Sequence, residues 1–311
     1  MGEWSKSIGE KGERIIKFIF EDILIYNSLQ ENISIDCIKG EKHKDSSAKN
    51  NRKSHGLDGF ISSKSPVEDN TLDIGVISSK YTADEYPKYP STLFKSHIKD
   101  LAITLECFNN SSLKNKTNFL FTDISKTEVF GILVWLSNTS TIDYDLSSKV
   151  SNIQIDNDLI FDKIILLDNC KVNFLYESIF KTNELFGIEN IDFVYHNTGL
   201  NFTAIQENSF GKTFPLNYLY SDIIALRVIN KSSIELRIFI NDDFSEDQFS
   251  QILNFAKSFD HLNTINKIIL FYKSYDYLLN ENQVKELLVN FPIYSLNENL
   301  VIKKFPSDFR N

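Results

Sequence analysis

The alternation of apolar and polar positions predicts a helix, a strand and a β-hairpin in the first third of the chain. Apolar residues recur at helical spacing over about residues 8–30, and Ser7 with Glu10 three residues later forms a capping-box pattern. Residues 32–38 form a short predicted strand. Two apolar runs within residues 55–81 then flank a polar turn, which is typical of a hairpin with a long connection.

The hairpin carries an acid on one strand and a lysine on the other. Asp58 lies in its first strand and Lys80 in its second. Because side chains alternate along a strand, Ser78 shares a face with Lys80, whereas Asp73 points the opposite way. Asp58 and Lys80 are therefore the first candidates for chemistry.

The helices on either side of the hairpin add polar groups. Glu13 shares a helical face with Ile16 and Phe20, and a carboxylate on such a stripe is costly unless it has a partner or a metal. The alternative is that Glu13 lies at the helix end and is hydrated. A second helix is predicted over about residues 92–109, with the solvent side at Lys95, Lys99 and Glu106. The polar stripe that borders its apolar face consists of His97, Asp100, Thr104 and Cys107.

The segment between the first predicted strand and the hairpin is the most basic one in the chain. Its cations lie within residues 39–53, and a phosphate backbone that approaches Asp58 would pass them, so Lys49, Arg52 and Lys53 are candidate DNA-phosphate contacts. The alternative is an ordinary solvated loop.

The rest of the chain alternates predicted strands and helices, which is typical of an α/β protein with parallel strand pairs. We expect a first domain over residues 1–198 and a second α/β domain over residues 199–311, the latter for partner or assembly contacts. Predicted strands cover residues 118–122, 129–136, 163–167, 191–195, 223–228, 234–240, 267–272 and 300–304, and predicted helices cover 172–186, a stretch after Ser245, and 281–290.

Composition narrows the function classes. The chain has 311 residues and 42% apolar content, enough for a folded core. Its net charge of −9 would repel nucleic acid from most of the surface, so any DNA contact must be local or shared with a basic partner. Cys37, Cys107 and Cys170 show no CxxC spacing and the five histidines no ligand spacing, so spacing predicts neither a disulfide framework nor a zinc site. No apolar segment reaches membrane-spanning length without charges, and we expect a cytoplasmic protein.

The order of helix, strand, strand with Asp, strand with xxK, and helix resembles the core of the PD-(D/E)XK nuclease superfamily. The resemblance rests on GEKGERII, HGLDGF and VISSKY. It implies a restriction-endonuclease-like mixed sheet flanked by helices. It further implies that Glu13 and Asp58 hold Mg²⁺, with Mn²⁺ as a possible substitute, and that Lys80 orients or activates the attacking water.

The chain departs from the superfamily pattern at Ser78, where an acid or Gln usually precedes the lysine by two residues. In the superfamily this acid can move onto the following helix, where Asp100 is the best-placed candidate replacement as a metal ligand, ahead of His97 and Glu106. The competing interpretation is an inactive scaffold that binds nucleic acid or a partner protein.

At a finer level, the same segments together with KSHIKDLAITLECF are similar to the nuclease subunit of a two-gene bacterial anti-phage system of the Guarding-Against-Phages group. This resemblance implies a DNA endonuclease with a second protein subunit encoded in the same operon. The lack of a long uncharged apolar segment separately predicts no membrane association. An RNA substrate and a homo-oligomer stay open.

Overall fold

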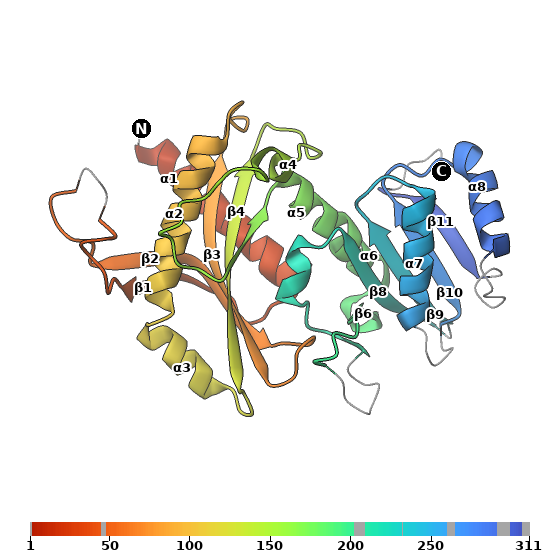
Figure 1. Ribbon diagram of the computed structural model, residues 1–311, viewed down its shortest axis with the longest axis horizontal. Coiled ribbons are helices and arrows are strands. Elements are labelled where there is room, and N and C mark those ends of the chain that lie inside the picture. Colours follow the sequence, from red (N-terminus) through yellow and green to blue (C-terminus); the bar gives the residue numbers. More distant parts are fainter. Residues whose placement is uncertain are drawn as a thin grey trace. The chain divides into compact units, whose positions relative to one another are not determined.

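In the computed structural model, the first five strands of the chain form one mixed sheet (Figure 1). β1, β2 and β3 are antiparallel neighbours, and β4 and β5 continue the sheet parallel to β3. The predicted hairpin and the mixed α/β fold are therefore confirmed. The strands are β1 (Gln30–Asp36), β2 (Ser54–Lys64), β3 (Thr71–Thr82), β4 (Lys126–Ser137) and β5 (Lys163–Leu167). The structure describes residues 2–44, 48–201, 209–231, 233–259, 265–290 and 299–306.

Helices cover both faces of this sheet, with α1 behind it and α2 in front of it (Figure 1). Helix α1 (Gly2–Lys17) continues into a π-helical turn at Phe18–Ile23, and its apolar stripe is fully buried. Helix α2 (Ser91–Phe108) packs its own apolar face on β3 and β4, where each fully buried aliphatic side chain contributes roughly 1.5–3 kcal/mol. Both helices are thus fixed relative to β3, the strand that carries Lys80.

One predicted strand is a helix instead. Residues 118–122 were expected in a strand, but α3 (Ser112–Leu120) occupies most of them, and Ser111 caps it by accepting a hydrogen bond from the Lys114 amide. Phe119 and Leu120 are exposed, so their apolar character does not reflect a buried strand. The cap signal at Ser111 favours the helix, and the short apolar run was misleading. Two further short helices, α4 (Leu146–Val150) and α5 (Asn169–Leu175), belong to the same part of the chain.

The chain divides into two compact units at Leu175, within a run of helical residues. The first unit also contains Pro215–Tyr220, and the second contains Tyr176–Phe214 and Ser221–Asn311. The expected domain boundary lay at residues 198 and 199. The structure differs because β6 (Ile191–Val194) pairs with β8, which follows it by about thirty residues, and a local pattern does not reveal a strand's partner.

The second unit contains a six-stranded mixed sheet in the order β11-β10-β9-β8-β6-β7. Its core packs α7 against the central strands, with Phe249 and Leu270 fully buried. The elements predicted for this part of the chain are present within a few residues. They are β8 (Ile223–Asn230), β9 (Ser233–Ile240), β10 (Lys267–Tyr272), β11 (Leu300–Lys304), α7 (Glu246–Phe259) and α8 (Tyr277–Asn290). α6 (Lys181–Phe186) is the end of the helix expected over residues 172–186, and the short strand β7 (Phe210–Gly211) lies in a stretch for which no strand was predicted.

None of the helices in the described residues combines the length and the apolar character needed to cross a bilayer.

Candidate active site

A cavity of about 390 Å³ lies at the carboxyl end of β3. It will be called the β3 cavity. Elements from both faces of the first sheet contribute to it, because α1 and α2 meet the strand ends there. Its lining consists of Gly9, Gly12, Glu13, Asp58, Ser79, Lys80, Tyr81, Thr82, His97 and Trp135. The structure therefore brings the three main sequence candidates, Glu13, Asp58 and Lys80, to one cavity.

An irregularity in β2 aims Asp58 at the neighbouring strand. Leu57 and Phe60 belong to the same α2-side core, although residues three apart in a regular strand point to opposite faces. The alternation therefore breaks between them, and the facing residue on β1, Asn32, has a positive φ of 55°. Asp58 Oδ2 accepts a hydrogen bond of 2.6 Å from the Ser79 amide. Within the described residues the carboxylate has no other hydrogen bond, so Oδ1 is available to a ligand.

Glu13 reaches the cavity because the adjacent residue on α1 is a glycine. A Cβ at Gly12 would lie 3.2 Å from Ser79 Oγ and 3.4 Å from Tyr81 Cβ, so a larger residue would push the helix away from β3. Glu13 itself is exposed, whereas Ile16 and Phe20 on the same stripe are fully buried. The helix begins at Gly2, so Glu13 does not lie at its start, but its exposure agrees with the expectation that this acid is hydrated.

An ion pair with α2 fixes Lys80. Its Nζ lies 3.2 Å from Asp100 Oδ2, and the guanidinium of Arg52 lies 3.5 Å from Asp100 Oδ1. Both carboxylate oxygens thus face cations, and Asp100 is not among the residues that line the cavity. This arrangement favours a role for Asp100 in positioning Lys80. The expectation that Asp100 itself binds a metal stays a prediction.

His97 packs against Trp135 in the wall of the cavity, with the two ring centroids 4.9 Å apart in an edge-on arrangement. Burial lowers the pKa of His97 to about 4, assisted by the charge of Lys80 and opposed by that of Asp100. The imidazole is therefore neutral at pH 7 and available to donate or accept one hydrogen bond. Trp135 was not predicted as a cavity residue from the sequence. It lies on β4, directly beside Lys80 of β3, and only the strand pairing places it there.

Ser78 does not substitute for an acid in the cavity. It is 9% exposed and does not belong to the lining, to which Ser79 contributes instead. Glu13 and Asp58 are the two carboxylates of the lining. Carboxylate oxygens are the donors that Mg²⁺ and Mn²⁺ prefer, and two of them facing one open cavity leave room for water and phosphate oxygens, so the residues fit such an ion.

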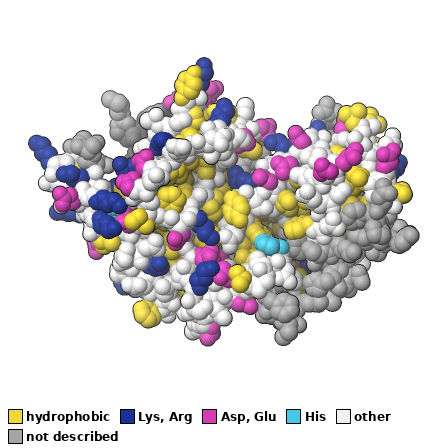
Figure 2. Space-filling view, in the orientation of Figure 1, with side chains coloured by type: hydrophobic (Ala, Val, Ile, Leu, Met, Phe, Trp, Pro, Cys, Tyr) yellow, Lys and Arg dark blue, Asp and Glu magenta, His cyan; other side chains and the backbone are white. Residues whose placement is uncertain are grey.

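The basic segment between β1 and β2 contains cations of two kinds. Lys49 and Lys53 are exposed, whereas Arg52 is half-buried, donates to the Ser54 carbonyl and contacts Asp100. Figure 2 shows Lys and Arg side chains gathered over the part of the surface where Figure 1 places this segment. The phosphate-contact role of Lys49, Arg52 and Lys53 stays a prediction, with Lys49 and Lys53 the more accessible.

One position on α2 was predicted wrongly. Glu106 was placed on the solvent side, but it is 5% exposed because the segment after β1 folds over it. Its carboxylate contacts Lys39 and Lys42, and lies 2.9 Å from His43 Nε2. Burial raises the pKa of Glu106, but the hydrogen bonds from these three residues outweigh it and lower the pKa to about 2. Helical periodicity cannot reveal such a cover, which comes from a distant loop.

Comparison with known proteins agrees with this geometry. No curated protein and no solved structure matches the chain. A family model described as the GAPS4 protein PD-(D/E)XK nuclease domain matches residues 1–171, which include every residue of the β3 cavity. The match covers more than half of the chain, and the protein belongs to the GAPS4 PD-(D/E)XK nuclease domain family.

Proposed function

We propose that this protein is a Mg²⁺-dependent DNA endonuclease subunit that acts in bacterial anti-phage defence. The observation that carries the proposal is the convergence of Glu13, Asp58 and Lys80 on one cavity at the end of β3. The family match supports the nuclease class. The metal, the DNA substrate and the defence role are parts of the proposal.

The chemistry divides among the cavity residues. Glu13 and Asp58 would hold Mg²⁺, which supplies electrostatic stabilisation of the charge that develops on phosphate and lowers the pKa of water. The Ser79 amide fixes Asp58 Oδ2, so Oδ1 keeps its direction. Lys80, oriented by Asp100, would donate a hydrogen bond to the attacking water or to a phosphate oxygen. His97, neutral at pH 7, can donate or accept a hydrogen bond from the same wall.

DNA would approach past the basic segment, with Lys49 and Lys53 on its phosphates. The net charge of −9 favours a basic partner subunit that shares the DNA contact. The second unit would supply partner or assembly contacts, and α8 supports this role because it exposes Leu278, Leu279 and Val289. A homo-oligomer would serve the same purpose.

The test is Asp58→Asn in the full chain, assayed for cleavage of double-stranded DNA with the co-encoded partner present. The amide oxygen still accepts from the Ser79 amide, so the fold is kept while one metal-binding charge is lost. We expect cleavage to fall by on the order of 10²- to 10³-fold. Asp243→Asn, an exposed acid of the second unit, is the matched control and should cleave like the wild type.

An alternative is favoured by Ser78: a catalytically inactive scaffold that binds nucleic acid or a partner. Its signature would be a wild-type protein that binds DNA, shows no heat of Mg²⁺ or Mn²⁺ binding that depends on Asp58, and cleaves nothing. Single-stranded RNA in the same substrate panel separates an RNA nuclease from a DNA nuclease. Equal cleavage by wild type and Asp58→Asn would contradict the proposed site.

A further inference from the structure

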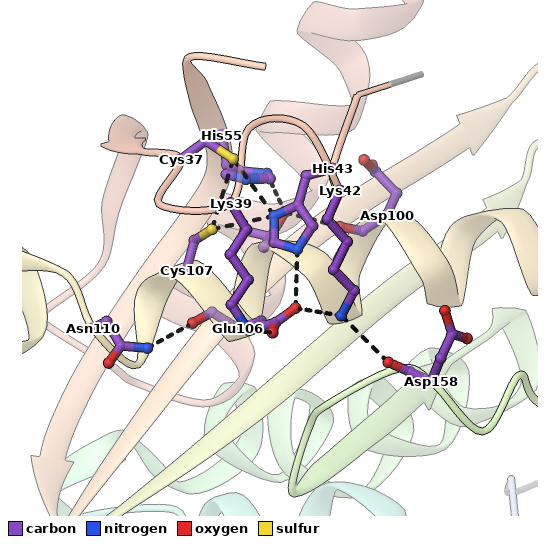
Figure 3. A network of polar contacts seen from close by, with 11 residues as sticks. Cys37, Lys39, Lys42, His43, His55, Asp100, Glu106, Cys107, Asn110 and Asp158 are labelled. Atoms are coloured by element: carbon purple, nitrogen blue, oxygen red, sulfur yellow. Dashed lines mark hydrogen bonds and ion pairs between the residues drawn. The ribbon is translucent and has the colours of Figure 1, made fainter. Parts of the chain in front are cut away.

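Four side chains of metal-ligating types meet between α2 and the first two strands (Figure 3), and none of them lines the β3 cavity. Cys37 directly follows β1, His43 lies in the turn after it, His55 lies on β2 and Cys107 on α2. One ligand atom from each lies within 4.8 Å of those of the others. This group will be called the Cys/His cluster.

The distances among Cys37, His43 and Cys107 are those of a tetrahedral metal site. Cys37 Sγ and Cys107 Sγ are 3.9 Å apart, and His43 Nδ1 lies 3.5 Å from the first sulfur and 3.4 Å from the second. Zn–S bonds of about 2.3 Å and Zn–N bonds of about 2.0–2.1 Å in a tetrahedron set two sulfurs about 3.8 Å apart and a sulfur and a nitrogen about 3.5 Å apart.

The tautomer of His43 is fixed by an acid behind it. His43 Nε2 lies 2.9 Å from Glu106 Oε2, and the oxygens of this carboxylate also accept hydrogen bonds from Lys39 and Lys42. The imidazole therefore donates its Nε2–H to Glu106 and turns the lone pair of Nδ1 toward the two sulfurs. A carboxylate that accepts from the far nitrogen of a histidine is the usual support of a metal-bound imidazole.

His55 is oriented in the same manner by Thr104. The single hydroxyl hydrogen of Thr104 is donated to the Asp100 carbonyl at 2.8 Å, so Thr104 Oγ1 must accept from His55 Nδ1–H at 3.3 Å. The lone pair of His55 then resides on Nε2. The His55 side chain is fully buried, and its Nε2 has no hydrogen-bond partner among the described residues. An orphaned buried nitrogen is costly, and a metal ion would satisfy it.

Burial and charge select the kind of ion. His43, His55 and Cys107 are at most 2% exposed, and two thiolates neutralise a divalent cation, so the occupied site carries no net charge in the interior. A closed site of two sulfurs and two imidazoles suits Zn²⁺ rather than Mg²⁺, which prefers oxygen. The two thiol protons leave to solvent when the metal binds.

We propose that Cys37, His43, His55 and Cys107 bind one structural Zn²⁺. The ion ties the segment after β1 and the start of β2 to α2. Backbone hydrogen bonds already close this segment, from Cys37 to the Lys53 carbonyl and from Arg52 to the Gly40 carbonyl. The metal would thereby hold Arg52 in contact with Asp100, beside Lys80. The site stands independently of the nuclease proposal, since no ligand lines the β3 cavity.

The test is the metal content of the full chain, purified without chelator and measured by inductively coupled plasma mass spectrometry. We expect about one zinc per chain, with an X-ray absorption spectrum that shows two sulfur and two nitrogen neighbours. Replacement by Co²⁺ should give the intense d–d bands of tetrahedral coordination and a thiolate charge-transfer band. These readouts use the wild-type protein, so they do not depend on whether a variant folds.

Ligand variants and matched controls complete the experiment. Cys107→Ser and His55→Ala should lower zinc affinity by at least about tenfold. Cys170→Ser and His196→Ala, which change the same residue types outside the cluster, should keep wild-type zinc. Zinc below about 0.2 per chain, an oxygen-only absorption spectrum, or a mass loss from a Cys37–Cys107 disulfide would each overturn the proposal.

Discussion

The β3 cavity and the Cys/His cluster share α2 and β2 but have opposite chemistry. The cavity is open and offers carboxylate oxygens, with Glu13 exposed and Asp58 half-buried. The cluster is closed and offers sulfur and imidazole nitrogen, with His55 fully buried. Both have an acid of α2 behind them, because Asp100 contacts Lys80 at the cavity and Glu106 contacts His43 at the cluster.

The difference shows how one helix can serve two sites. Asp100 stays 43% exposed in its side chain, and its partners are cations that face a cavity. Glu106, less than two helical turns further, is covered by the segment after β1 and holds a histidine for buried ligands. What covers each acid, rather than its position on the helix, decides whether the side chains beside it are open to solvent or enclosed.

Metal removal should separate the two sites most strongly. Brief treatment with EDTA should abolish DNA cleavage, to below about 1% of the starting rate, because the open cavity exchanges its ion with solvent. Added Mg²⁺ or Mn²⁺ should restore cleavage. Zinc, measured in the same samples, should stay bound because its ligands are buried.

A thiol-specific mercurial provides the reverse control. It should release zinc and lower the thermal midpoint of the first unit, since ligation of Cys107 fastens α2. Loss of zinc and of cleavage at the same EDTA concentration and rate would show that the two sites are not independent.

The first sheet and the two main cavity residues could be predicted because they depend on local patterns. The hairpin follows from strand periodicity and turn residues, and Asp58 and Lys80 lie on its two strands within one short segment. The predicted helices on its flanks bring Glu13 and His97 to the same place. Sequence reasoning therefore succeeds where a site is built around one supersecondary unit.

The remaining features depend on contacts between distant segments. Cys37 and Cys107 are 70 residues apart, and no spacing rule connects them. Glu106 is buried by the loop that contains His43, which is 63 residues away in the sequence. The break in β2 that aims Asp58 lies opposite Asn32 of β1, which has a positive φ. Such features require the tertiary structure.

Glu106→Gln tests the acid behind the cluster. The neutral amide removes the charge that favours His43 as a metal ligand, so zinc affinity should fall by about 10- to 100-fold in a competition with a fluorescent chelator. Cleavage in excess zinc should stay within about twofold of wild type, since Glu106 does not line the cavity. Unchanged zinc affinity together with reduced cleavage would reverse the assignment of this acid.

Asp100→Asn tests the acid behind the cavity, and its effect should be the smallest. Without the charge that holds Lys80 Nζ, the lysine samples other rotamers, and we expect single-turnover cleavage to fall by about tenfold with zinc content unchanged. Because Asp100 would act through Lys80, the same substitution in a Lys80→Met protein should change nothing further, so the two effects are not additive. Lys99→Met on the exposed side of α2 is the matched control for the lysine change. Additive losses would instead indicate that Asp100 touches the metal or the substrate directly, as its place in the sequence first suggested.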